Sequence, residues 1–352
     1  MKKFIVLSLS VLAVLCACTK NEAYDPDLGI DAPILFQAYD FASQTKAGTP
    51  TAFEGDNFAV FGYQHAAVWA TAIQPTSSDK PSRLMNNVEV VKNGSTNVWA
   101  PTTTYYWPKK DMLTFGAYAP KDQGGASFDF EKGITFSAFN VAAAPGDANE
   151  IDLLYSDTAS DKTYKNTNKD SDEAVMSNAD GVYLLFHHAL AKVNVTAKFN
   201  GHQNPGTTPV IKITGIKFAS IDTTGAGFNA TEQEWTTSNP ATQDMGVSAV
   251  TLNSSKPSDL VSDYFVMPQE LAAGTQQILV SYEITTTFSD NTTKTEVITE
   301  KAVDFKCDEI EDWDPNHVYT YGLNISAVSD DPITFDPAVM PWETGSSDST
   351  IK

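Results

Sequence analysis

The alternation of apolar and polar side chains along residues 182–199 changes phase partway through the segment. Apolar residues first occupy even positions and then odd ones, namely Val182, Leu184, Phe186 and Leu190 followed by Ala191, Val193, Val195, Ala197 and Phe199. Because residues two apart in a β-strand share a face, one unbroken strand would turn its second apolar set to the opposite side. A β-bulge near residues 188–191 could re-aim the chain. A crossing from one sheet or domain to the next also explains the central position of the break, and we adopt it as the boundary between two β domains.

Short apolar runs separated by Gly, Pro, Asn, Asp and Ser clusters continue along the chain from residue 34. No long stretch has helical periodicity. The predicted strands are 34–39, 58–63, 88–91, 112–118, 151–155, 210–218, 265–268, 278–284, 295–299 and 318–326. Many short antiparallel strands without helices predict an all-β protein made of Greek-key β-sandwiches.

Three local features refine this prediction. Gly215 lies where the apolar phase slips within 210–218, which predicts a bulge. Asp290 and Asn291 predict the turn of a hairpin that joins 278–284 to 295–299. The last candidate strand, 333–335, lies among Pro332, Pro337 and Pro341. Proline cannot donate to a β-ladder, so this segment is predicted to form a sheet edge.

Two polar stretches, 69–83 and 156–181, are predicted to be loops. The second is rich in Asn and Asp, as calcium-binding loops are. An EF-hand loop needs Gly at its sixth position, however, and a register beginning at Asn166 places Ser171 there. We therefore expect a solvated loop.

The length and charge of the chain limit its domain number and its partners. A chain of 352 residues has room for two domains, which we place at 32–188 and 189–352. The 23 Lys and Arg against 44 Asp and Glu give a formal net charge of −21, which repels phosphate backbones. Arg83 is the only arginine, although guanidinium is the usual group for bidentate phosphate or base contacts. Nucleic acid is therefore not an expected partner.

The N-terminus has the pattern of an export signal. Lys2 and Lys3 precede an apolar run at 4–15 that is too short to span a bilayer. The run ends in Leu-Cys-Ala-Cys, which resembles a bacterial lipobox with cleavage before Cys18 and acylation of its thiol. This predicts a signal peptide at 1–17, a tether at 18–31 and attachment to a membrane through acyl chains. An ordinary signal peptide with incidental cysteines is the alternative. If Cys18 is acylated, no internal disulfide is expected, and Cys307 is predicted to be a small buried apolar residue.

The sequence contains no motif for catalysis, a cofactor or a metal. It has no Gly-rich phosphate loop, no HExxH, no CxxC and no nucleophile elbow. His187 and His188 are adjacent and would point to opposite faces of a strand, so a structural role is favoured over a metal site. The acidic stretch 308–314 contains five carboxylates around Trp313, a pattern more typical of a solvated turn than of a glycosidase pair. We expect no enzymatic activity.

Four aromatic residues cluster in the first half of the chain. If exposed, they could form a platform for sugar rings, although neighbours in a strand more often place at least half of such side chains in the core. They are Trp99, Tyr105, Tyr106 and Trp107.

Several segments, taken in order, resemble the fimbrillin family, the subunits of type V pili in Bacteroidales. They cover nearly the whole chain: the lipobox at Cys18, FEGDNFAVFGY at 53–63, YYWPKKDMLTFGAYAP at 105–120, DLLYSDTA at 152–159, LLFHHALAKVNV at 184–195, WDPNHVYTYGLNIS at 313–326 and ITFDPAVMPW at 333–342. Each is a strand pattern alone, and the ordered set carries the resemblance. It implies two tandem transthyretin-like β-sandwich domains.

The resemblance also implies a mode of assembly. Stalk subunits of the family are exported as lipoproteins to the outer membrane, and a surface protease then cuts after the first strand, which leaves. Here the cut would fall between Lys46 and Ala47, although the family pattern favours arginine at that site. The displaced strand would carry Ile34, Phe36 and Ala38. An extended segment of a neighbouring subunit would fill the vacated groove, and the matching donor or edge residues are Ile333, Phe335, Val339 and Trp342.

Two functional hypotheses follow. The first is a structural pilin of a cell-surface fimbria, whose partners are other pilin subunits. The second is a surface lipoprotein that does not polymerise, either a pilus anchor that keeps its acylated Cys18 or an adhesin that binds a glycan or another ligand on a host or bacterial surface.

Overall fold

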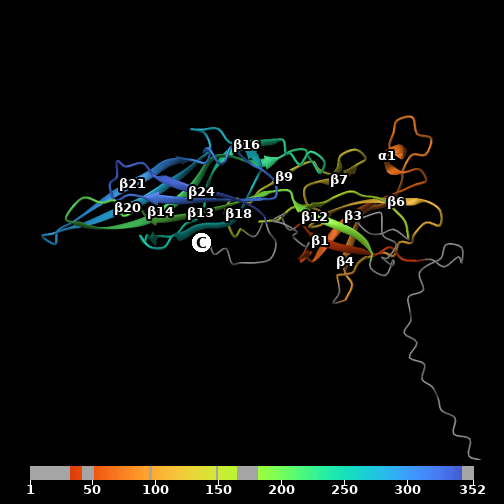
Figure 1. Cartoon of the computed structure of the whole chain (residues 1–352), viewed down its shortest axis with the longest axis horizontal. Helices are drawn as coiled ribbons and strands as arrows, with labels where there is room; N and C mark the ends of the chain where they lie inside the picture. Colours follow the sequence, from red (N-terminus) through yellow and green to blue (C-terminus); the bar gives the residue numbers. More distant parts are fainter. Residues whose placement is uncertain (1–31, 42–50, 95–96, 148–149, 165–180, 343–352) are drawn as a thin grey trace, which may run out of the picture.

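The computed structural model is elongated and built almost entirely of β-strands (Figure 1). It describes residues 32–41, 51–94, 97–147, 150–164 and 181–342. In this part of the chain the one helix is α1, Trp69–Ala72. No helix among these residues is long and apolar enough to span a membrane. The predicted all-β class is confirmed.

A nine-stranded sheet forms the N-terminal end of the molecule. Its members are β1 (Phe36–Asp40), β2 (Thr51–Ala52), β3 (Asn57–His65), β4 (Ser82–Lys92), β5 (Trp99–Pro101), β6 (Met112–Ala119), β10 (Leu154–Ser156), β11 (Ala159–Lys162) and β12 (Val182–His188). The main order is β10-β12-β1-β5-β4-β3-β6-β11, and β10 also pairs with β6. The sheet therefore closes on itself around one apolar core, which includes Phe58, Phe115 and Phe186.

Two sheets share a second core at the other end of the molecule. The four-stranded sheet has the order β18-β13-β23-β24, with bounds Ser258–Val266, Ala191–Phe199, His317–Ile325 and Thr334–Pro341. The six-stranded sheet contains β14 (Thr207–Gly225), β16 (Thr237–Asp244), β17 (Val250–Thr251), β20 (Gln277–Phe288), β21 (Thr293–Asp304) and β9 (Phe139–Asn140). Alternate residues of β13 and β20 face this core, as the half-buried pattern predicts.

The two ends are joined by strands and side chains from both halves of the sequence. Strand β9 pairs with β14, and β8 (Gly133–Phe136) pairs with β7 (Ala126–Asp129) and β15 (Phe228–Asn229). A two-stranded ladder of β19 (Gln269–Glu270) and β22 (Asp312–Trp313) completes the fold. A third apolar cluster fills the junction and includes Tyr118, Phe136, Leu190, Phe228 and Trp342.

The change of phase at residues 188–191 is a crossing between sheets. Strand β12 ends at His188 in the nine-stranded sheet, and β13 begins at Ala191 in the four-stranded sheet. Val182, Leu184 and Phe186 fill the first core, whereas odd residues of β13 fill the second. The predicted bulge at Gly215 is also confirmed, because the pairing of β14 with β20 shifts between Ile213 and Gly215.

Three predictions about local structure are wrong. The strands are not all antiparallel, because β1 pairs in parallel with β12 and β13 in parallel with β23. Residues 69–83 contain α1 and the start of β4 rather than only loop. The stretch 156–181 begins with the end of β10 and contains β11, which pairs with β6; residues 165–180 lie outside the described part.

Candidate functional site

Strand β1, the predicted first strand, lies inside the nine-stranded sheet. It pairs in parallel with β12 from Phe36↔Val182 to Asp40↔Phe186. On its other side it pairs with β5 only at Phe36↔Trp99, and with β2 only at Tyr39↔Ala52 and Asp40↔Thr51. Short interrupted pairing on one side leaves β1 with few ladder hydrogen bonds there.

The even-numbered residues of β1 and of the segment before it fill the N-terminal core. Ile34, Phe36 and Ala38, assigned from the sequence to the strand expected to be displaced, are buried. The Phe36 ring makes edge contacts with Phe58 and Phe115, with centroids 6.2 and 5.3 Å apart. These contacts mean that removal of β1 would open a groove lined by aromatic side chains.

Gly181 allows β1 to approach the start of β12 closely. Its φ of +86° favours glycine, and a Cβ there would lie 2.6 Å from the backbone nitrogen of Phe36. The Val182 N–H also donates to the Leu35 carbonyl oxygen at 2.7 Å. Any larger residue at 181 would therefore push β1 away from its neighbour.

Asp40 continues the inward-facing set of β1 and places a carboxyl group inside the protein. Asp40 is only 5% exposed, and its Oδ1 has no hydrogen-bond partner among the described residues. Burial, followed by the nearby charges of Asp152 and Glu54, raises the pKa of Asp40 to about 7. An inward carboxyl group without a full set of partners destabilises the strand that carries it.

Strand β24 forms the predicted sheet edge. It pairs with β23 from His317↔Pro341 to Asn324↔Thr334 and has no neighbour on its other side among the described strands. Ile333 and Phe335 pack against the C-terminal core, whereas Val339 is 41% exposed. Of the predicted donor residues, Phe335 and Val339 thus lie on a strand whose outer edge has no partner among the described strands.

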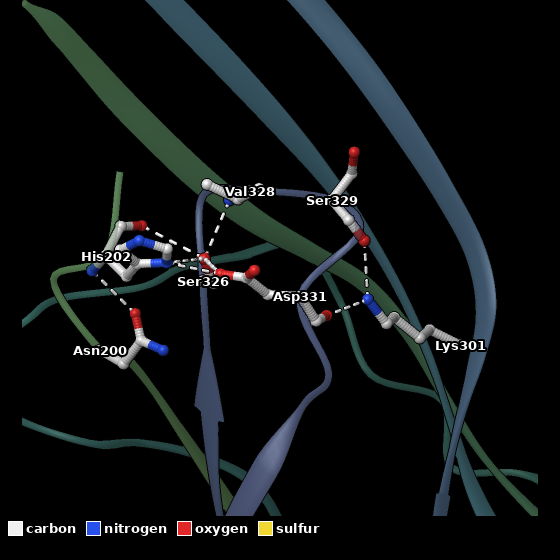
Figure 2. A network of polar contacts seen from close by, with 7 residues as sticks. All are labelled: Asn200, His202, Lys301, Ser326, Val328, Ser329 and Asp331. Carbon is white, nitrogen blue, oxygen red and sulfur yellow. Dashed lines mark hydrogen bonds and ion pairs between the residues drawn. The ribbon is translucent and has the colours of Figure 1, made fainter. Parts of the chain in front are cut away.

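Polar contacts hold the turn between β23 and β24 (Figure 2). Ser326 Oγ donates to Asp331 Oδ2 at 2.6 Å, and His202 Nδ1 lies 2.5 Å from the same oxygen. The Lys301 ammonium group donates to the carbonyl oxygens of Ser329 and Asp331. The hydrogen bonds from Ser326 and His202 lower the pKa of Asp331. One end of β24 is therefore held by a charged network.

Trp342 holds the other end of β24. It is buried in the junction, where its ring stacks on His188 with centroids 3.8 Å apart and an interplanar angle of 5°. The Lys192 ammonium group lies 4.2 Å from the centroid of the Trp342 ring. The Trp342 N–H donates to the Asn316 carbonyl oxygen at 2.9 Å. Unlike Val339, Trp342 is not available at the sheet edge in this arrangement.

Three predicted processing residues lie outside the described part of the chain. They are the lipidation site Cys18 and the cleavage site formed by Lys46 and Ala47. The sequence places Lys46 between β1 and β2, which are paired with each other. After a cut there, only noncovalent contacts would hold β1 to the rest of the sheet.

The histidine pair does not form a shared site. His187 Nε2 lies 2.9 Å from Asp157 Oδ1, and His188 Nδ1 lies 2.8 Å from Asp152 Oδ1. Among the described residues, no group of three or more His, Cys, Asp or Glu side chains is arranged to hold a metal ion. Each histidine thus has its own carboxylate partner.

The aromatic cluster is mainly part of the core. Trp99 and Trp107 are buried, whereas Tyr106 is 50% exposed. In the acidic stretch 308–314, Trp313 is buried in the C-terminal core, and Cys307 is partly buried against the same core. A sugar platform made of Trp99 and Trp107 is therefore excluded, because neither ring is accessible.

Sequence reasoning did not find a pocket at the junction. Its lining includes Asp40, Glu54, Glu150, Asp152, His188 and Trp342, which are far apart in the sequence. No motif spacing connects them. One signal was visible: Asp40 continues the even-numbered inward series of Ile34, Phe36 and Ala38, which places an acid on a core-facing position.

Comparisons with known proteins give a family for the sequence and similar structures for the fold. The sequence model of the family described as fimbrillin-like matches residues 45–342. A fimbrial protein from Bacteroides vulgatus has a similar structure, with a TM-score of 0.65 and 20% identity over 88% of this chain and 99% of that one. A putative cell adhesion protein from Parabacteroides distasonis gives a TM-score of 0.51 and 12% identity over 89% and 97%. A search of curated proteins finds no match.

Proposed function

Because the chain belongs to the fimbrillin-like family, we propose that it is a structural subunit of a cell-surface fimbria that polymerises by strand exchange. The family is a structural and adhesive one rather than an enzymatic one. The observation that carries the proposal concerns β1 and the segment just before it. Ile34, Phe36 and Ala38 fill a core, yet after a single cut between β1 and β2 only noncovalent contacts would hold them there.

The proposal includes two tandem transthyretin-like β-sandwich domains, at 32–188 and 189–352. Two separate apolar cores support this division. The crossing between β12 and β13 falls at the proposed boundary. The third cluster would then be the contact between the domains.

Export would precede assembly. The chain would be carried to the outer membrane as a lipoprotein acylated at Cys18, with residues 1–17 removed and 18–31 serving as the tether. Acyl chains would hold it at the surface until processing. A cut between Lys46 and Ala47 would then detach the acylated N-terminal segment and β1. The rest of the subunit would be free of its anchor.

Loss of β1 would expose the backbone of β12 and the groove that Phe36 fills. The N–H and C=O groups of β12 from Val182 to Phe186 would lose their partners on that side. Buried backbone groups without partners cost free energy, as does an exposed aromatic groove. A new strand that supplies both hydrogen bonds and apolar side chains would therefore bind strongly.

The C-terminal segment of a neighbouring subunit is the proposed donor. Ile333, Phe335 and Val339 lie on one parity, as do Ile34, Phe36 and Ala38 in the strand to be replaced. Donation would require β24 to leave β23 and Trp342 to leave the junction. The network at Ser326 and Asp331 would keep the turn fixed while the segment beyond it swings out.

Controlled processing tests this mechanism. Purified protein treated with a lysine-specific protease is expected to lose β1 and to form ladders that resist denaturant and dissociate on heating. A Lys46→Gln variant should keep β1 and stay monomeric under the same treatment. Clean trimming at Lys46 that leaves only monomers would overturn the polymerising role.

A reversible disulfide provides a matched control. Gln37 and Tyr183 are paired residues on β1 and β12 with partly exposed side chains. In a Gln37→Cys/Tyr183→Cys variant with Cys307→Ser, oxidation should hold β1 after the cut and prevent polymers, and reduction should restore them. Polymerisation that is equal in the oxidised and reduced forms would mean that β1 does not have to leave.

The alternative is a subunit that is never cut, such as a pilus anchor or an adhesin. Lys46 in place of the arginine that the family favours supports this alternative. Mass spectrometry of the mature N-terminus on cells separates the two roles. An acylated Cys18 indicates an anchor or adhesin, whereas Ala47 as the first residue indicates a processed stalk subunit.

A further inference from the structure

We propose that the pocket at the junction binds an organic cation with several N–H donors, an alkylammonium or guanidinium group. The cavity has a volume of about 590 Å³ and lies between the two ends of the molecule. Its lining combines Asp40 of β1, the segment 54–57, the segment 150–152, His188 of β12 and Trp342. The binding itself does not depend on strand exchange.

Unpartnered polar atoms gather in this pocket. Among the described residues, four buried side-chain atoms have no hydrogen-bond partner, and three of them belong to residues that line it: Asp40 Oδ1, Glu150 Oε1 and His188 Nε2. Asp40 is 5% exposed and His188 is 2% exposed. Buried polar atoms in folded proteins almost always have partners, so three in one cavity indicate that a polar group from outside belongs there.

The chemistry of these atoms determines the kind of ligand. Carboxylate oxygens accept hydrogen bonds. His188 Nδ1 is hydrogen-bonded to Asp152 Oδ1 at 2.8 Å, which leaves Nε2 as the ring nitrogen without a partner. The two carboxyl oxygens, Asp40 Oδ1 and Glu150 Oε1, thus call for donors. A guanidinium or ammonium group offers several donors and a positive charge.

The charges around the pocket also favour a cation. Five acidic residues line it, namely Asp40, Glu54, Asp56, Glu150 and Asp152. Lys192 is the one lysine in the lining, and its ammonium group lies 3.4 Å from Asp263 Oδ1 and over the ring of Trp342, which also lines the pocket. The raised pKa of Asp40 has burial as its main cause, followed by the charges of Asp152 and Glu54, which also line the pocket. A bound cation would relieve the repulsion between them.

A single metal ion fits this arrangement less well. The described residues contain no group of three or more His, Cys, Asp or Glu side chains placed to hold one. The carboxylates instead surround a cavity large enough for an organic group. An extended cation could donate from one N–H group to Asp40 and from another to Glu150.

Calorimetry with the full chain tests the proposal. L-Arginine amide is expected to bind saturably, with a dissociation constant in the millimolar range or tighter. L-Citrulline amide, in which a neutral urea group replaces the guanidinium, should bind at least about tenfold more weakly. Equal binding of the two, or no saturation by arginine amide up to about 10 mM, would overturn the proposal.

Two variants and a control locate the binding. Asp40→Asn and Glu150→Gln should each weaken arginine amide about tenfold or more, because each removes a charged acceptor. Asp308→Asn removes one charge from the exposed acidic stretch and should leave affinity unchanged. Glu150 is partly exposed in a loop, so its variant is expected to fold even if the change in β1 disturbs the sheet. Equal effects of Glu150→Gln and Asp308→Asn would overturn the assignment.

The source of the cation can be a diffusible amine or a side chain of a second copy. Sedimentation of the full chain separates the two. If the chain self-associates, and both arginine amide and the Glu150→Gln substitution abolish this association, the cation is a lysine of a second copy. If the chain is a monomer and binds arginine amide, the cation is a diffusible ligand. A calcium ion that binds alone and excludes arginine amide would contradict the proposed ligand class.

Occupancy of this pocket would also affect assembly, a consequence that rests on the proposed function. Asp40 lies on the strand that would leave, and Trp342 follows the strand that would be donated. A cation held by Asp40 would stabilise β1 in place. Arginine amide should therefore slow polymer formation after cutting at Lys46; failure of this effect alone would leave the binding result intact and count against the link to assembly.

Discussion

Strands β1 and β13 have similar places in the fold and differ in how firmly they are held. Each opens one half of the molecule, and each pairs in parallel with a later strand. Strand β13 has nine residues, lies between β18 and β23, and pairs along nearly its whole length on both sides. Strand β1 has five residues and is paired fully on one side only.

The inward-facing residues of the two strands sharpen this contrast. Those of β13 are all apolar, namely Ala191, Val193, Val195 and Ala197. Those of β1 end in Asp40, whose carboxyl group is buried without a partner for Oδ1. The comparison indicates that a strand can complete a core and still be suited to release, if its pairing is short and its last inward position is polar.

The largest expected effect is the loss of Phe36. Phe36→Ala should lower the free energy of unfolding of the N-terminal sheet by about 3–5 kcal/mol, because it removes a buried ring and leaves a cavity. Gln37→Ala changes the opposite face of the same strand and should cost about 0.5 kcal/mol or less. Urea denaturation of both variants checks this. Similar small losses in the two would show that β1 contributes little to the core.

The second effect depends on pH. The pKa of Asp40 is about 7 in the folded protein against an ordinary 3.8, so the folded state binds the extra proton between these values. Stability from this group is full below about pH 4 and is lost as the pH rises through 7. We expect a loss of about 2–3 kcal/mol between pH 5 and pH 8.

Asp40→Asn should remove that loss. Asp259→Asn, on an exposed position of β18 beside β13, should keep it. Denaturation at several pH values measures both. The prediction would be contradicted if the wild-type protein were more stable at pH 8 than at pH 5 and the Asp40→Asn substitution altered this pH dependence of stability.

A smaller effect is expected at the turn before β24. Ser326→Ala removes the hydrogen bond to Asp331 and should cost about 1–3 kcal/mol. Ser329 contributes its backbone carbonyl to the network, so Ser329→Ala should change stability by about 0.5 kcal/mol or less. Thermal unfolding compares the two. Equal stability of both variants would mean that the network does not hold the turn.

The smallest effect on stability concerns the outer edge of β24. Val339→Lys and Met340→Lys alter adjacent exposed residues and should each change the free energy of unfolding by about 0.5 kcal/mol or less. Only Val339 shares parity with Ile333 and Phe335. Val339→Lys should therefore block polymer formation after trimming, whereas Met340→Lys should allow it. Gel ladders report the difference, and identical ladders would remove Val339 from the donor surface.

Periodicity predicted those parts of the fold whose signal is local. The phase change at 188–191 located the crossing between β12 and β13, and the prolines around 333–341 located the edge strand. The parallel partners of β1 and β13 were missed because pairing between distant strands has no local signal. Strand β11 was missed because its residues, Ala-Ser-Asp-Lys, have the composition of a loop and are held by pairing with β6.

The candidate sites were predictable to different degrees. Ile34, Phe36 and Ala38 were predicted as part of the first strand, whereas Asp40 lay beyond its predicted end, although it continues their even-numbered series. The pocket was not predicted, because Asp40, Glu150 and His188 are brought together only when both halves of the chain have folded. The position of Trp342 was likewise hidden, since an aromatic residue that follows an edge strand gives no sign that it stacks on His188.

Native-state hydrogen exchange of the uncut protein tests the central claim, that β1 is held more weakly than β13. We predict that the amides of residues 36–40 in β1 exchange through a local opening, with lower protection than those of 193–197 in β13, which exchange only on global unfolding. Equal protection of the two strands, with the same dependence on denaturant, would contradict the account.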